Sequence, residues 1–600
     1  METFERIVNQ LNDLVWNSGI PFGGEILPFV VIALIGTGIF LTLRLGFVQL
    51  RHLGHGFAVT TGKYDDPNEP GDVSHFQALT TALSATVGIG NIAGVAIAIH
   101  WGGPGALFWM WVTAFLGMAT KYTEVTLAQH YRTVERPDLD AKKWEGTVAG
   151  GPMYYIERGL GAIGKPLAIL FAVLLGTTAF LTGNAIQANT VADTVAASYG
   201  VAPWITGLVT AAVVAMVILG GITRIGKVTA VLAPLMAAIY VTAALFILLL
   251  NVDQIIPSFA LIFREAFNPT AGVAGTGMGV FLVTMMWGVR RGLFSNEAGQ
   301  GSAPIAHAAA KTDEPVSEGV VALLEPFIDT IVICSLTALV IIVTGVWSDT
   351  TPTAISLSGG DLSFVAQTED GGFQAVEAPA EIVVEGGRQV AAAGAPRLAW
   401  HEVAVEQLFV DAAMTQPFTG RIVRGYDDPG TEAVEALPIA VAADGTQYTV
   451  LHGPAVESGA PLTALAFRTG MPGEWADLIV LVSVLLFAVS TAISWSYYGD
   501  RCAYYLFGSK AVLPYKMVYV GMHFFGAVVP LAAVWTLGDV FLGLVILPNL
   551  LALILLSGKV AEMTRSYFER KPWIQNAEDH KRAVERERAA KAARQKEPQP

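Results

Sequence analysis

A run of glycines inside a membrane-length apolar segment is the feature that most constrains the fold of this chain. The segment extends from about 77 to 100, and its centre reads Ala82-Leu-Ser-Ala-Thr-Val-Gly-Ile-Gly-Asn-Ile-Ala-Gly94. About 20 apolar residues cross a bilayer as a helix, but glycine is a poor helix former. Unwound backbone persists in hydrocarbon only where protein, ligand or water supplies hydrogen-bond partners. The sequence therefore predicts a helix that is broken beside a polar site in mid-bilayer.

The composition also indicates an integral membrane protein. Of 600 residues, 53% are hydrophobic and only 14% are charged, which is too apolar for a soluble globule of this length. Eleven apolar runs approach the spanning length of about 20 residues. They cover roughly 26–46, 78–100, 104–128, 166–195, 204–221, 228–250, 276–299, 318–346, 475–499, 515–535 and 537–557.

The lysines and arginines predict how the chain is oriented in the membrane. If each apolar run crosses once, most of the 36 basic residues fall on the side that also receives the C-terminus. Because cytoplasmic loops carry the excess of positive charge, we expect a multi-pass protein of the cell (inner) membrane with its N-terminus outside. The predicted regions are a membrane region at 1–346, an acidic outer insertion at 347–474, the last three helices at 475–558 and a charged cytoplasmic tail at 559–600.

The outer insertion has the pattern of short strands. The stretch Glu381-Ile-Val-Val-Glu385 alternates polar and apolar residues, and turn residues such as Asp444-Gly445 separate such stretches. This alternation is typical of half-buried strands. We expect a small β-rich extracytoplasmic domain whose acidic residues keep it solvated.

A second interrupted segment indicates an internal repeat. It reads Met286-Trp-Gly-Val-Arg-Arg-Gly-Leu-Phe-Ser-Asn-Glu-Ala-Gly-Gln-Gly301, and we expect the helix to break at 288–292. This is the seventh apolar run and the first break is in the second run, so the two cross the membrane in opposite directions. Broken helices at corresponding positions of two halves are typical of inverted-repeat transporters with a mid-membrane binding site. We expect one extra N-terminal helix followed by five plus five helices.

Four motifs resemble those of the alanine or glycine:cation symporter family. The first is Ala-Leu-Ser-Ala-Thr-Val-Gly-Ile-Gly-Asn from Ala82, and the second is Gly-Gly-Pro-Met-Tyr-Tyr-Ile from Gly150. The third is Arg-Gly-Leu-Phe-Ser-Asn-Glu-Ala-Gly from Arg291, and the fourth is Ser-Thr-Ala-Ile-Ser-Trp-Ser-Tyr-Tyr-Gly from Ser490. The resemblance covers about 20–346 and 460–565. It implies an all-α membrane protein with a leucine-transporter-like inverted repeat of 11 helices, which couples entry of a small amino acid to a sodium gradient. The insertion 347–460 inherits no function from the family.

The residues near the first break have the chemistry that a zwitterion and a sodium ion require. A carboxylate prefers backbone N–H groups at a half-helix N-terminus, and Na⁺ prefers oxygen ligands. The resemblance adds Gln187 as a substrate ligand and a serine–threonine pair as sodium ligands. Our substrate-binding candidates are Gly88, Ile89, Gly90, Asn91, Gln187, Phe294, Thr491 and Trp495. Our sodium candidates are Ser84, Val87, Ser490 and Thr491 for one ion, and Thr86 and Asn91 for a second.

Structural roles remain open for several of these residues. The glycines could serve close helix packing, the hydroxyls could bond their own helix, Gln187 could bond a neighbouring helix, and the two aromatic residues could be core. Intramembrane charges are candidates for function. We expect Arg290 or Arg291 to pair with Glu325 or Asp329 and lock an inner gate, and Lys121 to pair with Glu124.

Secondary symport is the function that these patterns favour, with a small neutral amino acid and the lipid bilayer as partners. The coupling ion is Na⁺, and H⁺ is not excluded. The chain has no phosphate-binding Gly-x-x-x-x-Gly-Lys-[Ser/Thr] motif, so we expect no nucleotide, no nucleic acid and no enzymatic activity. Two alternatives stay open: a passive amino-acid channel, and a membrane-anchored enzyme or sensor that acts through the outer insertion, where His401, Glu402 and Glu406 form a weak metal pattern.

Overall fold

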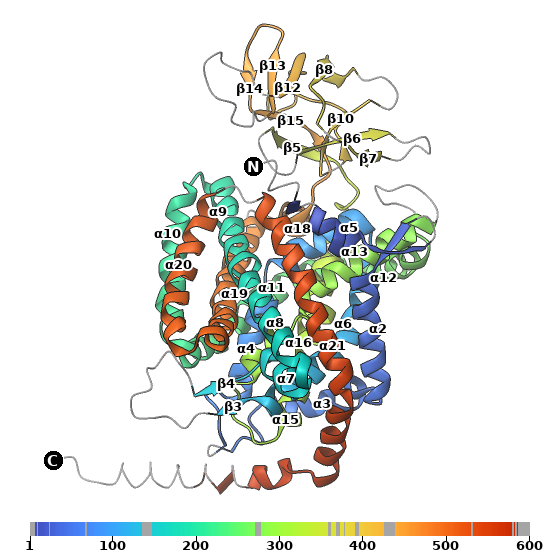
Figure 1. Ribbon diagram of the computed structural model, residues 1–600. Coiled ribbons are helices and arrows are strands. Elements are labelled where there is room, and N and C mark those ends of the chain that lie inside the picture. The colour runs from blue at the N-terminus through green and yellow to red at the C-terminus, as the bar shows by residue number, and fades with distance from the viewer. Residues whose placement is uncertain are drawn as a thin grey trace, which may run out of the picture.

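The computed structural model describes residues 7–585, apart from 9, 23–24, 67–68, 135–146, 270–277, 358–361, 368–372, 377, 391–394, 402, 425–437, 474, 530–531, 579–580 and 583–584. Helices make up most of these residues and form one bundle (Figure 1). Five helices are each long and apolar enough to cross a membrane, and two bent pairs raise that number to seven among the described residues. The molecule is therefore a multi-pass membrane protein.

Each apolar run of the sequence contains helical structure. The principal helices are α2 (Phe29–Arg44), α4 (His75–Thr86) with α5 (Val95–Gly102), α6 (Ala106–Tyr131), α8 (Gly164–Phe180) with α9 (Ile186–Tyr199), α10 (Pro203–Ile218), α11 (Gly221–Leu250), α13 (Met278–Asn296), α15 (Pro315–Ala322) with α17 (Ser335–Val343), α19 (Trp475–Phe507), α20 (Val512–Val528) and α21 (Ala532–Arg570). Shorter helices connect or cover them: α3 (Val48–Thr60), α7 (Pro152–Gly159), α12 (Val252–Phe267), α14 (Ala303–His307), α16 (Leu324–Pro326) and α18 (Gly459–Gly470).

Three of the membrane helices contain widened π-helical turns. They are η2 (Gly90–Gly94) between α4 and α5, η4 (Leu181–Ala185) between α8 and α9, and η5 (Phe327–Cys334) between α16 and α17. π-Helical turns inside α-helices occur frequently at functional sites. Each of these turns carries a buried polar side chain, respectively Asn91, Asn184 and Asp329. Such groups are costly in an apolar interior unless they have partners, so the three turns mark where polar chemistry is concentrated.

The segment between α17 and α18 forms antiparallel sheets at one end of the bundle (Figure 1). The strands are β5 (Thr351–Ser356), β6 (Leu362–Gln367), β7 (Phe373–Ala375), β8 (Glu381–Glu385), β9 (Arg388–Gln389), β10 (Arg397–Trp400), β11 (Val403–Ala404), β12 (Gly420–Arg424), β13 (Pro438–Ala442), β14 (Gln447–Tyr448) and β15 (Val450–Ala455). They pair in the orders β11-β10-β6-β7, β14-β13-β12-β8-β9 and β15-β5. Ile382 and Val384 of β8 point into a separate hydrophobic core with Phe418. We call these strands the β domain.

The β domain is joined to the first broken helix at two places. His100 near the end of α5 forms a 3.0 Å hydrogen bond through Nε2 with the carbonyl of His401. Directly after β15 the chain enters α18, where the Thr463 hydroxyl donates to the carbonyl of Ile92 at 3.0 Å. Residue Ile92 lies within η2. The outer sheets and the interrupted helix are thus linked through both of these connections.

The opposite end of the bundle is closed by backbone contacts between distant segments. Residues just before α4 and just after α14 run parallel, and Val73 forms a bridge with Ala310. The carbonyl of Ala309 accepts from the amides of Asp72 (2.8 Å) and Val73 (3.2 Å). This pairing connects the start of the first broken helix to the end of the second. We call it the closed end.

Candidate functional site

The first broken helix is interrupted where the glycine pattern predicts. Helix α4 ends at Thr86, and the chain bends by 54° before it resumes. The freed amide of Gly88 donates to the Asn91 side-chain oxygen at 2.9 Å. Asn91 thus satisfies one of the backbone groups that unwinding exposes. The prediction of a break at 88–91 is confirmed.

The second break lies farther along the chain than expected. Helix α13 continues from Met278 to Asn296, so the prediction of a break at 288–292 is wrong. Both glycines of that stretch serve helix packing: a Cβ on Gly288 would lie 2.4 Å from the carbonyl oxygen of Ala106 in α6, which is the small-residue contact typical of membrane helices. The chain leaves the helix at Glu297, where φ is +55°, and turns again at Gly299 and Gly301 with φ of +92° and +76°.

A small cavity of about 20 Å³ lies between the two breaks. A space of this size holds about one water molecule, so the lining has to move apart before a small amino acid can enter. Its lining combines backbone of the first break with side chains from α13, α19 and η4. The lining residues are Ala85, Thr86, Gly88, Ile89, Gly90, Thr182, Gln187, Phe294, Glu297, Gln300, Thr491, Trp495 and Leu542. Every predicted substrate-binding residue except Asn91 is among them.

Gln187 directs an unused acceptor to this cavity. Its side-chain amide donates to the carbonyl of Thr182 at 3.1 Å, which lies in the widened turn η4. Its Oε1 atom is buried and has no hydrogen-bond partner within the described residues. A buried acceptor without a partner is energetically costly. An ammonium group in the cavity would satisfy it.

Phe294 and Trp495 are the aromatic walls of the cavity. Phe294 lies close to the backbone of the first break, since a Cβ on Gly90 would be 3.2 Å from its ring. Trp495 is 2% exposed and donates from its indole nitrogen to Glu297 at 3.1 Å. This hydrogen bond fixes the indole plane against the second break. Both rings line the cavity opposite the backbone of the first break.

Ser490 and Thr491 direct their hydroxyls to the C-terminal end of α4. Both contact the carbonyl of Ser84, at 3.3 Å and 3.1 Å, and Thr491 also contacts that of Ala85 at 3.3 Å. The Ser84 hydroxyl is buried without a hydrogen-bond partner among the residues that the structure describes. Carbonyl and hydroxyl oxygens in one buried cluster are the ligands that a hard cation prefers. The residues predicted to hold the first sodium ion therefore fit such an ion.

Asn91 lies on the far side of the break from the cavity, in a second polar cluster. Its side-chain amide donates to the carboxylate of Asp329 at 2.6 Å and to the Ser295 hydroxyl at 3.2 Å. Ser295 and Thr330 in turn donate to the other oxygen of Asp329, at 2.6 Å and 2.7 Å. Sequence reasoning missed Ser295, and it gave Asp329 a different role. The three positions 91, 295 and 329 are far apart in sequence, and only the fold brings them together.

The predicted gate pairs are not formed in this structure. Arg290 pairs with Asp539 at 2.9 Å and stacks on Trp16, whereas Arg291 stacks on Trp287 and Phe294. Both arginines lie before the break on α13, which packs mainly against α5 and α6, and Arg290 contacts the N-terminal segment and α21. Their predicted partners are in η5 and α16 on another side of the second break, so the prediction of an arginine–carboxylate lock is wrong.

Glu325 and Lys121 form a buried ion pair that sequence analysis assigned to other partners. The ammonium group of Lys121 lies 3.1 Å from Glu325, and both side chains are fully buried. Glu124 accepts instead from Asn549 at 2.6 Å and from the amide of Gly301 at 3.1 Å. The expected Lys121–Glu124 pair is therefore replaced. Residue spacing along one helix gave no signal for partners 204 positions apart.

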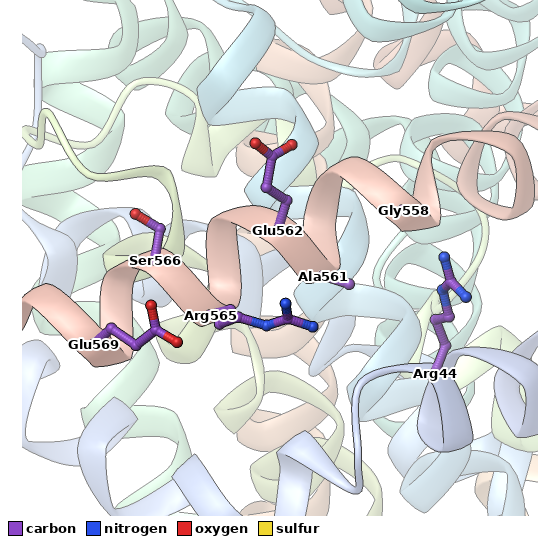
Figure 2. Close-up of a pocket in the computed structure, with 7 residues that line it drawn as sticks. All are labelled: Arg44, Gly558, Ala561, Glu562, Arg565, Ser566 and Glu569. Carbon is purple, nitrogen blue, oxygen red and sulfur yellow. The ribbon is translucent and has the colours of Figure 1, made fainter.

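Two other places with possible binding roles lie away from the breaks. An open groove between α21 and the end of α2 is lined by the mixed charges of Arg44, Glu562, Arg565 and Glu569 with Gly558, Ala561 and Ser566 (Figure 2). It shares no lining residue with the buried cavity. In the β domain, His401 joins no cluster of three or more metal-binding side chains among the described residues, and Glu402 lies outside them.

Two interrupted helices that enclose a polar cavity in an apolar bundle define a membrane transporter. Comparison with known sequences specifies which one. The sequence model of the Sodium:alanine symporter family matches residues 1–367 and 435–582, and the chain belongs to this family of transporters, which are symporters and not enzymes.

Characterised and uncharacterised relatives align along almost the whole chain. The sodium/alanine symporter AgcS of Methanococcus maripaludis is 39% identical over 578 residues, which cover 96% of this chain and 100% of the relative. An uncharacterized transporter of Haemophilus influenzae is 34% identical over 95% of this chain and 97% of its own length. The amino-acid carrier protein AlsT of Bacillus subtilis is 29% identical over 94% and 92%. The chain is thus a cation-coupled amino-acid symporter.

Proposed function

We propose that the chain imports a small neutral amino acid of the alanine or glycine class together with Na⁺, by alternating access. The observation that supports this most directly is the buried cavity between the two breaks, with Gly88, Gly90 and the unused Gln187 oxygen on its wall. The substrate carboxylate binds the amides of the first break, where the following half-helix contributes a positive dipole end. The substrate ammonium binds Gln187.

Substrate size is set by the aromatic walls. Phe294 and Trp495 face the backbone cradle, and the hydrogen bond from Trp495 to Glu297 holds the indole in place. A hydrogen or methyl side chain would require the smallest movement of these rings, while a longer chain would displace them farther. This restriction is the reason to propose alanine and glycine over larger amino acids.

One sodium ion binds where α4 meets α19. Its ligands are the carbonyls of Ser84 and Val87 and the hydroxyls of Ser490 and Thr491. The two hydroxyls already converge on the Ser84 carbonyl, so only small shifts are needed for oxygens to surround an ion. Because this cluster bridges the first broken helix and α19, an ion there favours the arrangement in which the two helices are together.

A second sodium ion binds around Asn91. Thr86 and Asn91 are its predicted ligands, and the contacts of Asp329 and Ser295 with Asn91 add two further oxygens. Asp329 supplies a negative charge that would balance the cation in an otherwise neutral environment. The ion would touch the substrate carboxylate, because its ligand Thr86 also lines the cavity, so each would raise the affinity for the other.

The membrane arrangement follows from the basic residues. We place the N-terminus and the β domain outside the cell membrane, and the closed end in the cytoplasm. The bundle then comprises 11 spans, an N-terminal helix followed by two inverted sets of five in the manner of leucine-transporter-like proteins. In this placement the structure is shut toward the cytoplasm, where segments 70–73 and 309–312 are hydrogen-bonded.

Transport in sealed vesicles tests this function. Purified protein in liposomes should take up labelled alanine only with an inward sodium gradient, and unlabelled alanine inside should accelerate exchange. A passive channel would show neither saturation nor this trans-acceleration. Removal of 351–460 distinguishes the remaining alternative: if the β domain were the active region, uptake specificity would be lost, whereas an accessory domain leaves alanine preferred over larger amino acids.

A further inference from the structure

A chain of buried ionisable side chains extends from the closed end toward the centre of the bundle. His75 contacts Glu318 through Nδ1, and the second oxygen of Glu318 contacts Nδ1 of His307. Nε2 of His307 is 2.6 Å from Glu325, which pairs with Lys121 at 3.1 Å. All five side chains are at most 2% exposed. We call this set the histidine–glutamate chain.

The position of His307 between two carboxylates requires bound protons. A neutral imidazole carries one N–H, so it can donate to only one carboxylate and must present a lone pair to the other. Glu318 and Glu325 can both remain ionised beside His307 only if the ring carries a proton on each nitrogen. If the ring loses one proton, two acceptors face each other in a buried site, which is strongly unfavourable.

The histidine–glutamate chain also connects the two broken helices at the closed end. His75 is the first residue of α4, and His307 is the last residue of α14. Arg132 reinforces the same junction because its guanidinium donates to the carbonyls of Pro70, Ala308, Ala310 and Thr312, at 2.5 to 2.9 Å. Opening this end must separate α4 from α14, and that separation breaks the link through Glu318.

Among the described residues, the histidine–glutamate chain has polar access from the closed end. Asp65, which is 31% exposed, lies 3.9 Å from His75, and Glu69 interacts with the same ring. Burial raises the pKa of Glu69 to about 7, so this loop carboxyl can exchange protons near neutral pH. Toward the cavity, Lys121 interacts electrostatically with Glu297 and Glu124, but both of these have other hydrogen-bond partners, Trp495 and Asn549.

Charged and titratable groups approach His307 from every element packed on it. Together they contribute three cationic groups, besides the ring itself, and several carboxylates. They are His75 on α4, Lys121, Glu124 and Arg132 on or next to α6, Glu297 after α13, Glu318 on α15, Glu325 on α16 and Tyr498 on α19.

From this geometry we infer that His307 and its two carboxylate partners form a proton-binding site, filled from the cytoplasm, whose protonation holds the cytoplasmic gate closed. The inference rests on the proposed function for its direction in the membrane, and it adds a second cation, H⁺, as a gating ligand. A rise in cytoplasmic pH removes the proton, makes His307 face an unprotonated carboxylate with a lone pair, and favours opening.

Hydrogen exchange at the junction measures this directly. The full chain in lipid nanodiscs, without sodium or amino acid, is compared at pH 6 and pH 8.5, with rates corrected for base catalysis. The amides of Asp72, Val73 and Lys311 report gate opening because they are hydrogen-bonded across the junction. For a one-proton site the population of the open form rises by up to about tenfold per pH unit. We expect protection in the wild type to fall by at least about tenfold.

His307→Gln removes the titrating ring, and the fall in protection should then stay below about threefold. His130→Gln, at an exposed position on α6, is the matched control and should behave as the wild type. If His307→Gln fails to fold, His75→Gln interrupts the same chain at its outer link and should weaken the response likewise. Constant protection in the wild type, or an unchanged response in both chain variants, would overturn the inference.

Vesicle measurements separate this inference from the proposed function. The initial rate of alanine uptake should depend on the pH at the cytoplasmic face. The pH on the outer face should have no effect through the His307 site. Alanine uptake should drive no proton movement through His307, as measured with a pH dye. If alanine does drive proton movement and His307→Gln abolishes it, the site is a transport path and the gating role is overturned. If the wild type shows no sodium-dependent uptake, the proposed function is refuted but the hydrogen-exchange result is unaffected. If uptake is normal and the protection of the junction amides does not change with pH, only the inference about His307 is refuted.

Discussion

The two broken helices use different chemistry at their interruptions. Where the first break faces α19, its contacts are neutral oxygens and amides contributed by Ser84, Gly88, Ser490 and Thr491, and a single carboxylate, Asp329, bonds Asn91 behind it. The second break, from Glu297 to Ser302, lies among buried ionisable groups, with Glu297 in the turn and Glu124 bonded to the amide of Gly301. Fixed dipoles bind ions and zwitterions without changing their own charge, whereas titratable groups exchange protons and form ion pairs. Neutral ligands therefore predominate where the first break faces α19, and titratable groups predominate at the second break.

The largest effect is expected from breaking the charge balance beside the second break. Lys121→Met leaves Glu325 buried without its cation, and the loss of one partner of a buried pair costs about 3–5 kcal/mol of stability. Thermal or denaturant unfolding of the purified protein measures it. Lys165→Met is the matched control, because Lys165 is 59% exposed in its pair with Glu157 and surface pairs contribute at most about 1 kcal/mol. Equal losses in both variants would contradict the distinction.

At the first break, loss of one neutral oxygen should affect ion binding and leave stability nearly intact. Thr491→Ala removes a sodium ligand, and a hydrogen bond or ligand to a charged group contributes about 1.5–3 kcal/mol. We expect the half-saturating sodium concentration for alanine uptake to rise about 10- to 100-fold. Thr178→Ala, which removes a buried hydroxyl that bonds its own helix, should leave sodium dependence unchanged. A wild-type response in Thr491→Ala would remove this residue from the site.

Asp329 places a carboxylate in the polar cluster behind the first break, so a change at this residue tests whether an ion binds there. Asp329→Asn keeps the size of the side chain and removes the charge that would balance a second ion. If two sodium ions bind cooperatively, the Hill coefficient of sodium-dependent uptake should fall from about 2 toward about 1. Asn91→Ala should have the same effect, because Asn91 bonds this carboxylate. A coefficient that both changes leave intact would exclude an ion at this cluster.

Gln187→Ala should produce a smaller and more selective change. The variant loses the unused acceptor in the cavity, and one hydrogen bond to an ammonium group corresponds to about a tenfold change in affinity. The KM for alanine should therefore rise about tenfold while the sodium requirement stays constant. Competition by unlabelled alanine in vesicles measures both quantities. A shift in sodium dependence alone would mean that Gln187 supports the fold of η4 and not the substrate.

A pH-dependent effect on stability is expected at Glu69, outside the membrane region. Burial raises the pKa of this carboxyl from 4.5 to about 7, so its ionisation opposes folding as the pH rises through that interval. Glu69→Gln should match the wild type in melting temperature near pH 4.5, exceed it progressively up to about pH 7, and keep a constant difference above. Glu562→Gln, on an exposed side chain, serves as control. A difference that shrinks with rising pH would contradict the assignment.

The sequence was informative where a function depends on residues close together in the chain. Gly88, Gly90 and Asn91 revealed the first break because their own backbone preferences cause it. Ser490 and Thr491 were placed correctly as a pair facing α4, which the resemblance to a known family indicated. The motif that ends at Gly301 contains the second break, but the break was expected at 288–292 and the chain leaves the helix only at Glu297.

The errors arose where the answer depends on partners far apart in sequence. Gly288 and Gly292 look like helix breakers, but α6 packs against them and keeps the helix regular. Lys121 and Glu325 are 204 residues apart, and the contacts of His307 join four helices that no local pattern connects. Charge pairing across helices depends on their relative rotation and depth, and neither quantity can be read from spacing along one stretch of sequence.

The two links between the β domain and the first broken helix have a practical consequence. A tilt of α5 and η2 would draw the β domain with it, because His100 bonds the carbonyl of His401 and Thr463 of α18, which follows β15, bonds the carbonyl of Ile92. A binder raised against the sheets would then act as a brake on the transport cycle without touching the cavity. The family match omits residues 368–434, so such a binder would act on a part of the chain that the family model does not include.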